Sequence, residues 1–170
     1  MTWPITLTIL SLLVVNQVST QSAGTCTHSF VSLDGSCYKG IKLSATWPDA
    51  LAYCEVFGAE LAIITSAEEQ TAVQTYLATL RDPEYGDRDD HQYWFGANDV
   101  ITEGDWKWAV TTKPVNYTNW SQGQPDNGGS DKDYDEEHCA EMSEERHWQW
   151  NDSGCEGKKH FLCEMISESE

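Results

Sequence analysis

The first part of the folded region alternates apolar and polar residues before it changes to a helical spacing. Residues 30–40 (FVSLDGSCYKG) have the alternation typical of β-strands, and Asp34-Gly35 in the middle is a pair that favours a tight turn. We therefore expect a β-hairpin at the start of the domain.

An amphipathic helix is predicted directly after this hairpin. Thr46 is suited to cap its N-terminus, Pro48 fits its first turn, and Gly58 is suited to end it. The apolar residues that recur at helical spacing are Ala50, Leu51, Cys54 and Phe57.

A second helix is predicted after a short apolar strand from Leu61 to Ile64. Ser66 and Glu69 have the spacing of a capping box, which marks the N-terminus of this helix. Its apolar face comprises Val73, Tyr76, Leu77 and Leu80.

The second half of the chain has a different pattern. Short apolar segments there alternate with loops rich in glycine, asparagine and aspartate. Two early helices followed by strands predict an α+β fold with antiparallel sheets. The connection over residues 116–137 is long for a compact domain, and loops of this length are commonly functional.

Residues 1–20 have the features of a secretory signal peptide. Their apolar run, Ile5 to Val15, is shorter than the ~20 residues that span a bilayer. The first 24 residues carry no Asp, Glu, Lys or Arg, and we place the cleavage near residue 20 and no later than about residue 24. We expect a secreted, extracellular product without membrane insertion, with its domain over residues 26–165; a buried N-terminal strand is the alternative.

The six cysteines predict disulfides, which are common in small secreted domains. None forms a Cys-x-x-Cys pair, which argues against zinc binding and thiol redox chemistry. Their spacing alone does not choose among the pairings of Cys26, Cys37, Cys54, Cys139, Cys155 and Cys163.

The charge of the chain favours cations over nucleic acids. The formal net charge is −18 at pH 7, which repels phosphate backbones and anionic lipids. Residues 123–139 (GQPDNGGSDKDYDEEHC) place six carboxylates beside one lysine, and Asn151-Asp152 follows shortly afterwards. Crowded carboxylates repel one another unless a cation neutralises them, and calcium prefers oxygen ligands of these kinds. The loop therefore predicts a calcium site, with a cis Gln124-Pro125 bond as a further hypothesis.

Several motifs in order resemble the C-type lectin domain in its six-cysteine form. The resemblance covers essentially the whole chain from Cys26 to Cys163. The matching motifs are WFGA (94–97), NWSQGQPD (119–126), EEHCAEM (136–142), WND (150–152) and HFLCEM (160–165).

The resemblance implies a C-type lectin-like fold and a calcium-dependent lectin. It implies the disulfides Cys26–Cys37, Cys54–Cys163 and Cys139–Cys155. It also implies one principal calcium ion (Ca²⁺) held by Gln124, Asp126, Glu137, Asn151 and Asp152. In sugar-binding members two adjacent hydroxyls of the sugar complete the shell of the ion, and the calcium ligands hydrogen-bond the same hydroxyls.

The Gln124-Pro125-Asp126 triplet is of the type that goes with galactose or N-acetylgalactosamine in this family. The expected partners are therefore glycans with terminal galactose-like sugars, on cell surfaces or microbes. Galactose-binding members place a tryptophan two residues after the aspartate, where this chain has Gly128. Tyr134 or Trp148 is the hypothetical substitute ring. A mannose-tolerant or broad-specificity lectin is the alternative.

A second calcium site, found in many members, is expected to be incomplete here. Asp99 and Glu103 match its acidic residues and Glu137 would be shared, whereas Asn127 and His138 stand where aspartate is usual. 

Three Asn-x-Ser/Thr sequons begin at Asn116, Asn119 and Asn151, and Asn116 is the best candidate for glycosylation. A glycan on Asn151 would destroy the predicted site, so Asn151 is expected to be unmodified.

Neither catalysis nor a purely protein-binding role is expected. A glycosidase needs two facing carboxylates, one in surroundings that raise its pKa, and an exposed loop lacks such surroundings. A lectin-like module that binds protein typically loses its calcium ligands, whereas all five are present here. Single-site affinity for a monosaccharide should be weak, so a homodimer or larger oligomer would supply avidity.

Overall fold

The computed structural model describes residues 26–80, 91–128 and 136–166, with the side chain of the last residue excepted. The predicted hairpin is confirmed: β1 (Val31–Leu33) pairs antiparallel with β2 (Ser36–Ala45). Asp34 and Gly35 form the turn between them with φ values of 46° and 90°. Positive φ at both turn residues suits the right-handed twist of the strands, which explains this residue pair. The predicted signal peptide lies outside the described residues.

Helix α1 (Trp47–Val56) begins where its cap residue predicts. Thr46 Oγ1 accepts a hydrogen bond from Asp49 N at 3.3 Å. Gly58, with φ of 67°, follows the end of the helix and adopts the left-handed conformation that glycine tolerates best. Ala50 and Cys54 of the predicted apolar face are buried, and Leu51 and Phe57 are half-buried.

Helix α2 (Ala67–Thr79) has a modified capping box. Ser66 Oγ accepts from Glu69 N at 3.0 Å, as predicted. The Glu69 carboxylate, however, accepts from Thr65 N at 2.6 Å, and it also accepts from the Tyr38 hydroxyl. The preceding strand is shorter than predicted: β3 spans Glu60–Leu61, and Ile63 N donates to the side chain of Glu164 in β8 at 2.8 Å, not to a backbone carbonyl.

The remaining strands are β4 (Gln92–Asn98), β5 (Lys107–Trp108), β6 (Cys139–Ser143), β7 (Trp150–Ser153) and β8 (Lys159–Ile166). Together with β1, β2 and β3, these strands form one sheet. Its order is β1-β2-β8-β4-β6-β7, and β3 pairs with β8 while β5 pairs with β4. The predicted antiparallel pairing is confirmed between most neighbouring strands, and one pair differs, since β4 and β8 run parallel. An alternating pattern indicates a strand but carries no information about the direction of its partner.

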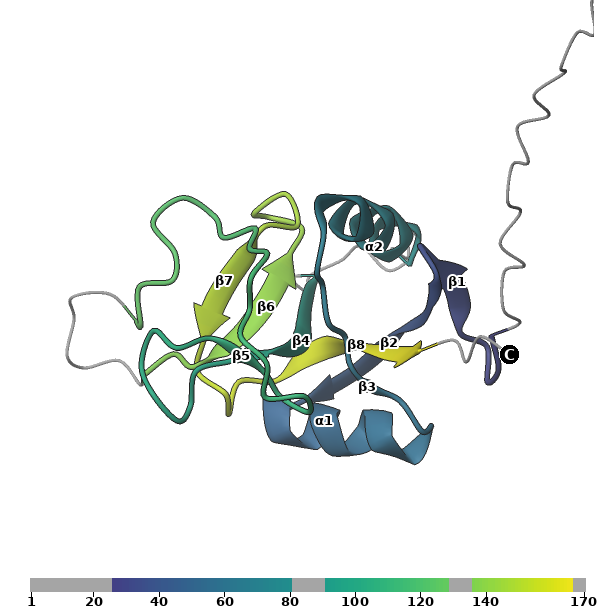
Figure 1. The fold of residues 1–170 in the computed structure, drawn as a ribbon, viewed down its shortest axis with the longest axis horizontal. Helices are drawn as coiled ribbons and strands as arrows, with labels where there is room; N and C mark the ends of the chain where they lie inside the picture. Colours follow the sequence, from purple (N-terminus) through teal and green to yellow (C-terminus); the bar gives the residue numbers. More distant parts are fainter. Residues whose placement is uncertain (1–25, 81–90, 129–135, 167–170) are drawn as a thin grey trace, which may run out of the picture.

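The two helices cover two separate hydrophobic clusters. Val73 and Leu77 of α2 join one cluster, which also contains Phe95 and Trp150, whereas Cys54 of α1 joins the other. Figure 1 shows α1 below and α2 above strands β2 and β8, with β6 and β7 on the side away from β1. No helix in the described ranges is long and apolar enough to cross a bilayer.

The three implied disulfides are confirmed: Cys26–Cys37, Cys54–Cys163 and Cys139–Cys155. The first closes the N-terminal hairpin, and the second fastens α1 to β8 across 109 residues. The third joins the start of β6 to the segment after β7. It therefore links the start of β6, which follows Glu137, to the chain just beyond β7, the strand that carries Asn151 and Asp152.

Candidate metal centre

Three carboxylates from separate segments meet beside β7. Asp126 comes from the long loop, Glu137 lies two residues before the start of β6, and Asp152 lies within β7. One carboxylate oxygen of each lies within 4.8 Å of the others. Asp126 is exposed and Glu137 half-buried, whereas Asp152 is only 1% exposed. We call Asp126, Glu137 and Asp152 the first cluster.

The long loop is bound to β7 through its backbone. Ser121 N donates to the Trp150 carbonyl at 2.8 Å, and Trp150 N donates to the Asn119 carbonyl at 2.8 Å. Asp152 Oδ2 accepts hydrogen bonds from Asp126 N (3.0 Å) and Asn127 N (2.7 Å). The sheet thereby fixes the position of the loop residues that supply predicted ligands.

Glu137 is held by the same loop. Its Oε2 accepts from Gly128 N at 3.1 Å, and its backbone N donates to Asn127 Oδ1 at 2.8 Å. The Gln124-Pro125 peptide bond is cis, as hypothesised from the sequence.

Three oxygens of predicted ligands are buried and have no hydrogen-bond partner within the described part of the chain. They are Gln124 Oε1, Asn151 Oδ1 and Asp152 Oδ1. An unsatisfied buried polar group costs about 1–3 kcal/mol, so such atoms normally have a ligand. Carboxylate and carboxamide oxygens are the donors that calcium prefers. The residues present therefore fit a calcium ion.

The pKa shifts of the first cluster also fit a bound cation. Burial raises the pKa of Asp152, with a further rise from the charge of Asp126, although backbone hydrogen bonds partly oppose this. Burial and the neighbouring charge of Asp152 likewise raise the pKa of Glu137. Like charges held together without a counter-charge disfavour ionisation, and a bound cation would reverse that effect.

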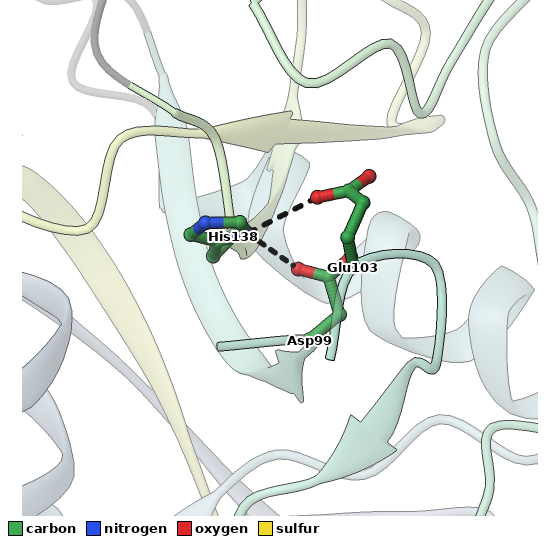
Figure 2. Close-up of side chains that lie close together, drawn as sticks. All are labelled: Asp99, Glu103 and His138. Atoms are coloured by element: carbon green, nitrogen blue, oxygen red, sulfur yellow. Dashed lines mark hydrogen bonds and ion pairs between the residues drawn. The ribbon is translucent and has the colours of Figure 1, made fainter. Parts of the chain in front are cut away.

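A second cluster, formed by Asp99, Glu103 and His138, lies close to the first. Figure 2 shows the His138 ring facing both carboxylates. His138 Nδ1 is 3.0 Å from Asp99 Oδ1 and 3.4 Å from Glu103 Oε2, while its Nε2 is 3.1 Å from Glu136 Oε2. Asp99 is buried, and its Oδ2 accepts from Gly104 N at 2.7 Å.

Histidine changes the charge balance of this second cluster. Burial lowers the pKa of His138, but its hydrogen bonds to Glu136 and Asp99 and the attraction of both clustered carboxylates raise the pKa overall. Burial and repulsion from Asp99 raise the pKa of Glu103, with His138 acting in the opposite direction. A protonated imidazole here supplies a positive charge, whereas no cationic side chain pairs with the first cluster in the part of the chain that the structure describes.

The structure brings together part of the predicted second calcium site. Asp99 and Glu103 lie together, with His138 as the third potential ligand. Asn127 instead accepts from Glu137 N, and the Glu137 carboxylate belongs to the first cluster. The second calcium site stays a prediction.

The hypothetical stacking rings receive no support. Tyr134 lies outside the described residues. Trp148 is half-buried against the core, with its ring centroid 6.2 Å from that of Tyr93, and its carbonyl accepts from Gln70 Nε2 at 3.0 Å. Gly128, with φ of 77°, has no side chain to offer. A stacking role for either ring stays a prediction.

Sequence reasoning missed two charged residues behind the centre, Glu141 on β6 and Lys159 on β8. Their side chains form a buried ion pair at 2.8 Å. The available signal was a glutamate inside the apolar strand segment CAEM, because a charge in such a strand requires a partner. 

The sequon residue Asn116 is exposed, which a glycosylated asparagine requires, and Asn151 is buried, which agrees with an unmodified side chain. Whether Asn116 carries a glycan stays a prediction.

Comparisons with known proteins identify the fold and the family. Residues 43–165 match the family described as the Lectin C-type domain. The chain is 34% identical to perlucin from Haliotis laevigata over 140 residues, covering 82% of each protein. It is 35% identical to asialoglycoprotein receptor 2 from Mus musculus over 147 residues, covering 85% of this chain and 44% of the receptor.

A solved structure agrees with these relatives. The carbohydrate-recognition domain of the mouse scavenger receptor C-type lectin superposes with a TM-score of 0.70 at 30% identity. That match covers 85% of this chain and all of the mouse domain.

Proposed function

The chain belongs to the C-type lectin domain family, and we propose that it binds glycans through one calcium ion at the first cluster. The proposed ligands combine carboxylates with carboxamides: Gln124, Asp126, Glu137, Asn151 and Asp152. The observation that carries this proposal is the burial of oxygens on Gln124, Asn151 and Asp152 that have no hydrogen-bond partner among the described residues, beside three clustered carboxylates. Members of a lectin family bind sugars without converting them, which agrees with the expectation that the chain is not an enzyme.

Bound calcium would supply coordination positions for two adjacent sugar hydroxyls. The protein residues define the pattern of donors and acceptors around those hydroxyls. Gln124 presents an amide that can donate, and Asp126 and Glu137 present carboxylates that only accept. Asp126 is exposed and Gln124 is half-buried, so the cis-proline turn presents this face of the centre to solvent.

We propose galactose or N-acetylgalactosamine as the sugar class because of the Gln124-Pro125-Asp126 triplet. Gly128 removes the ring that packs on galactose in galactose-binding members, so we expect modest affinity and reduced discrimination against mannose. Cell-surface or microbial glycans with several terminal sugars are the expected targets. Clustered copies of the chain would raise avidity for them.

We further propose that the protein works outside the cell. Three disulfides are stable in oxidising compartments, and residues 1–20 resemble a secretory signal peptide. Detection of the mature chain in the medium of expressing cells, starting near residue 21, would test this proposal.

A glycan array read with calcium and with excess chelator tests the function. We expect galactose-type ligands to bind with calcium and to be lost with chelator. The double variant Gln124→Glu/Asp126→Asn reverses the amide and the acid, and should shift binding toward mannose-type ligands. Gln122→Glu/Asp105→Asn is the matched control, with the same chemical exchange at exposed positions outside the proposed ligand set. Binding that persists in chelator would overturn the proposal.

A further inference from the structure

The amide group of Asn151 is held by hydrogen bonds within the protein. Its Nδ2 donates to Glu141 Oε1 at 3.1 Å and to the Asp152 carbonyl. Its Oδ1 is buried and has no hydrogen-bond partner among the described residues. Turning the amide over would place two acceptor oxygens against each other, because an ionised glutamate cannot donate. Glu141 therefore selects the orientation in which Oδ1 points away from it.

Glu141 is in turn held by a buried lysine. Lys159 Nζ lies 2.8 Å from Glu141 Oε2, and these side chains are 11% and 3% exposed, respectively. Lys159 Nζ also donates to Gln92 Oε1 at 2.9 Å and lies 4.8 Å from the centre of the Trp94 ring. A buried glutamate without such a partner would be strongly disfavoured. Strands β4, β6, β7 and β8 thus each contribute one part of this arrangement.

We propose that Glu141, held by Lys159, is a positioning residue that orients Asn151 Oδ1 toward the calcium ion. This inference rests on the proposed function of the first cluster. Residues behind metal ligands commonly change metal affinity by about 10–100-fold when they are removed. Both hydrogen bonds of the Asn151 amide nitrogen are made within the protein, which leaves Oδ1 as the atom that would face the ion.

The Lys159→Met variant separates positioning from simple electrostatics. Removing a positive charge near a cation site should strengthen calcium binding if only net charge matters. If Lys159 holds Glu141 in place, the same change should weaken calcium binding by about tenfold. Lys159→Arg retains the charge and a hydrogen-bonding head group, and we expect it to bind calcium within about threefold of the natural protein.

Two further variants complete the set. Glu141→Gln can present either its oxygen or its amide to Asn151, so we expect calcium affinity to fall by about tenfold. Glu144→Gln is the matched control, because Glu144 follows the end of β6 and its carboxylate is 3.7 Å from His91 rather than beside a proposed ligand. Gln92→Ala removes only one contact of Lys159 and is a milder test of the same arrangement if Glu141→Gln does not fold.

Calcium titration calorimetry, with near-ultraviolet circular dichroism as the check on folding, measures these affinities. The second readout is the Asn151 side-chain amide signal in the calcium-free protein, assigned by its loss in Asn151→Asp. We expect slow hydrogen exchange of this amide in the natural protein and in Lys159→Arg, and faster exchange in Lys159→Met.

Unchanged or tighter calcium binding by folded Lys159→Met would overturn the positioning role. If the natural protein bound no calcium at all, the proposed function would fail, whereas the exchange measurement would still show whether Glu141 and Lys159 fix the amide. If exchange of the Asn151 amide is equal in all variants, the positioning role is wrong.

Discussion

Two neighbouring clusters of acidic residues differ in a way that predicts which one needs a metal ion. Glu137 belongs to the first cluster and His138, the next residue, to the second. Among the described residues, no cationic side chain pairs with the carboxylates of the first cluster, which lie beside buried oxygens that have no described partner. In the second, the His138 ring faces both Asp99 and Glu103 and carries the counter-charge itself when protonated. Each cluster offers three potential metal-ligating side chains, but only the second contains a side chain that can neutralise its carboxylates.

The largest expected effect comes from removing one charge in the first cluster. Asp152→Asn should weaken calcium binding by at least about 100-fold, because it removes a charged ligand. Asp99→Asn makes the same exchange in the second cluster and should change the affinity of the principal ion by less than about threefold, since it is not among the proposed ligands. Calorimetric calcium titration of both folded variants measures this difference. Equal losses in the two variants would remove the distinction between the clusters.

Calcium should also stabilise the folded protein. At a free calcium concentration 100 times the dissociation constant, binding to the folded state alone adds about 2.7 kcal/mol to the free energy of unfolding. Urea unfolding with calcium and with chelator measures this gain. We expect Asp152→Asn to lose the gain and Asp99→Asn to keep it. A calcium effect of the same size in both variants would contradict the assignment.

A single substitution in the second cluster should create the need for a second ion. His138→Asp replaces the imidazole with a third carboxylate and removes the internal counter-charge, so the cluster becomes similar in composition to the first. We expect the stoichiometry of calcium binding to rise from one ion per chain to two, with the added ion binding more weakly. His138→Asn, which removes the imidazole without adding charge, is the control and should remain at one. Two ions in the natural protein would show that His138 does not replace the cation.

A smaller and graded effect is expected from pH. The pKa values of Glu137 and Asp152 are raised, chiefly by burial, so these groups take up protons at higher pH than ordinary carboxyls. Calcium requires the ionised form, so its affinity should be complete above the raised pKa values and should fall as pH decreases through them. Calcium titrations between neutral pH and pH 4, at constant ionic strength, measure the midpoint. A midpoint at or below the range of ordinary exposed carboxyls would contradict the burial argument.

The sequence predicts local structure well where one or two residues determine it. Thr46 and Ser66 cap the helices as expected, and Asp34-Gly35 forms the hairpin turn. These features depend on short-range backbone geometry, which a few residues specify. The family resemblance supplied the disulfide pairings, and it identified residues of the candidate centre before their positions were known.

Features that depend on long-range contacts could not be predicted in the same way. The parallel pairing of β4 with β8 depends on how distant segments assemble. The hydrogen bond from Ile63 N to the Glu164 carboxylate, beside the short strand β3, joins residues that are far apart in the sequence. The support for Asn151 requires Glu141, Lys159 and Gln92 to converge from separate strands. The spacing of apolar and polar residues along the chain does not indicate which side chains of separate strands meet. Likewise, the position of Trp148 against Tyr93 is a matter of packing that the count of aromatic residues left open.

A crystal structure of the protein with calcium and galactose tests the central claim most directly. We predict one ion with oxygens at about 2.3–2.6 Å. The protein ligands would be Gln124, Asp126, Glu137, Asn151 and Asp152. Two adjacent hydroxyls of the sugar would complete the shell. An ion held instead by Asp99, Glu103 and His138, or a sugar bound away from the ion, would contradict the account.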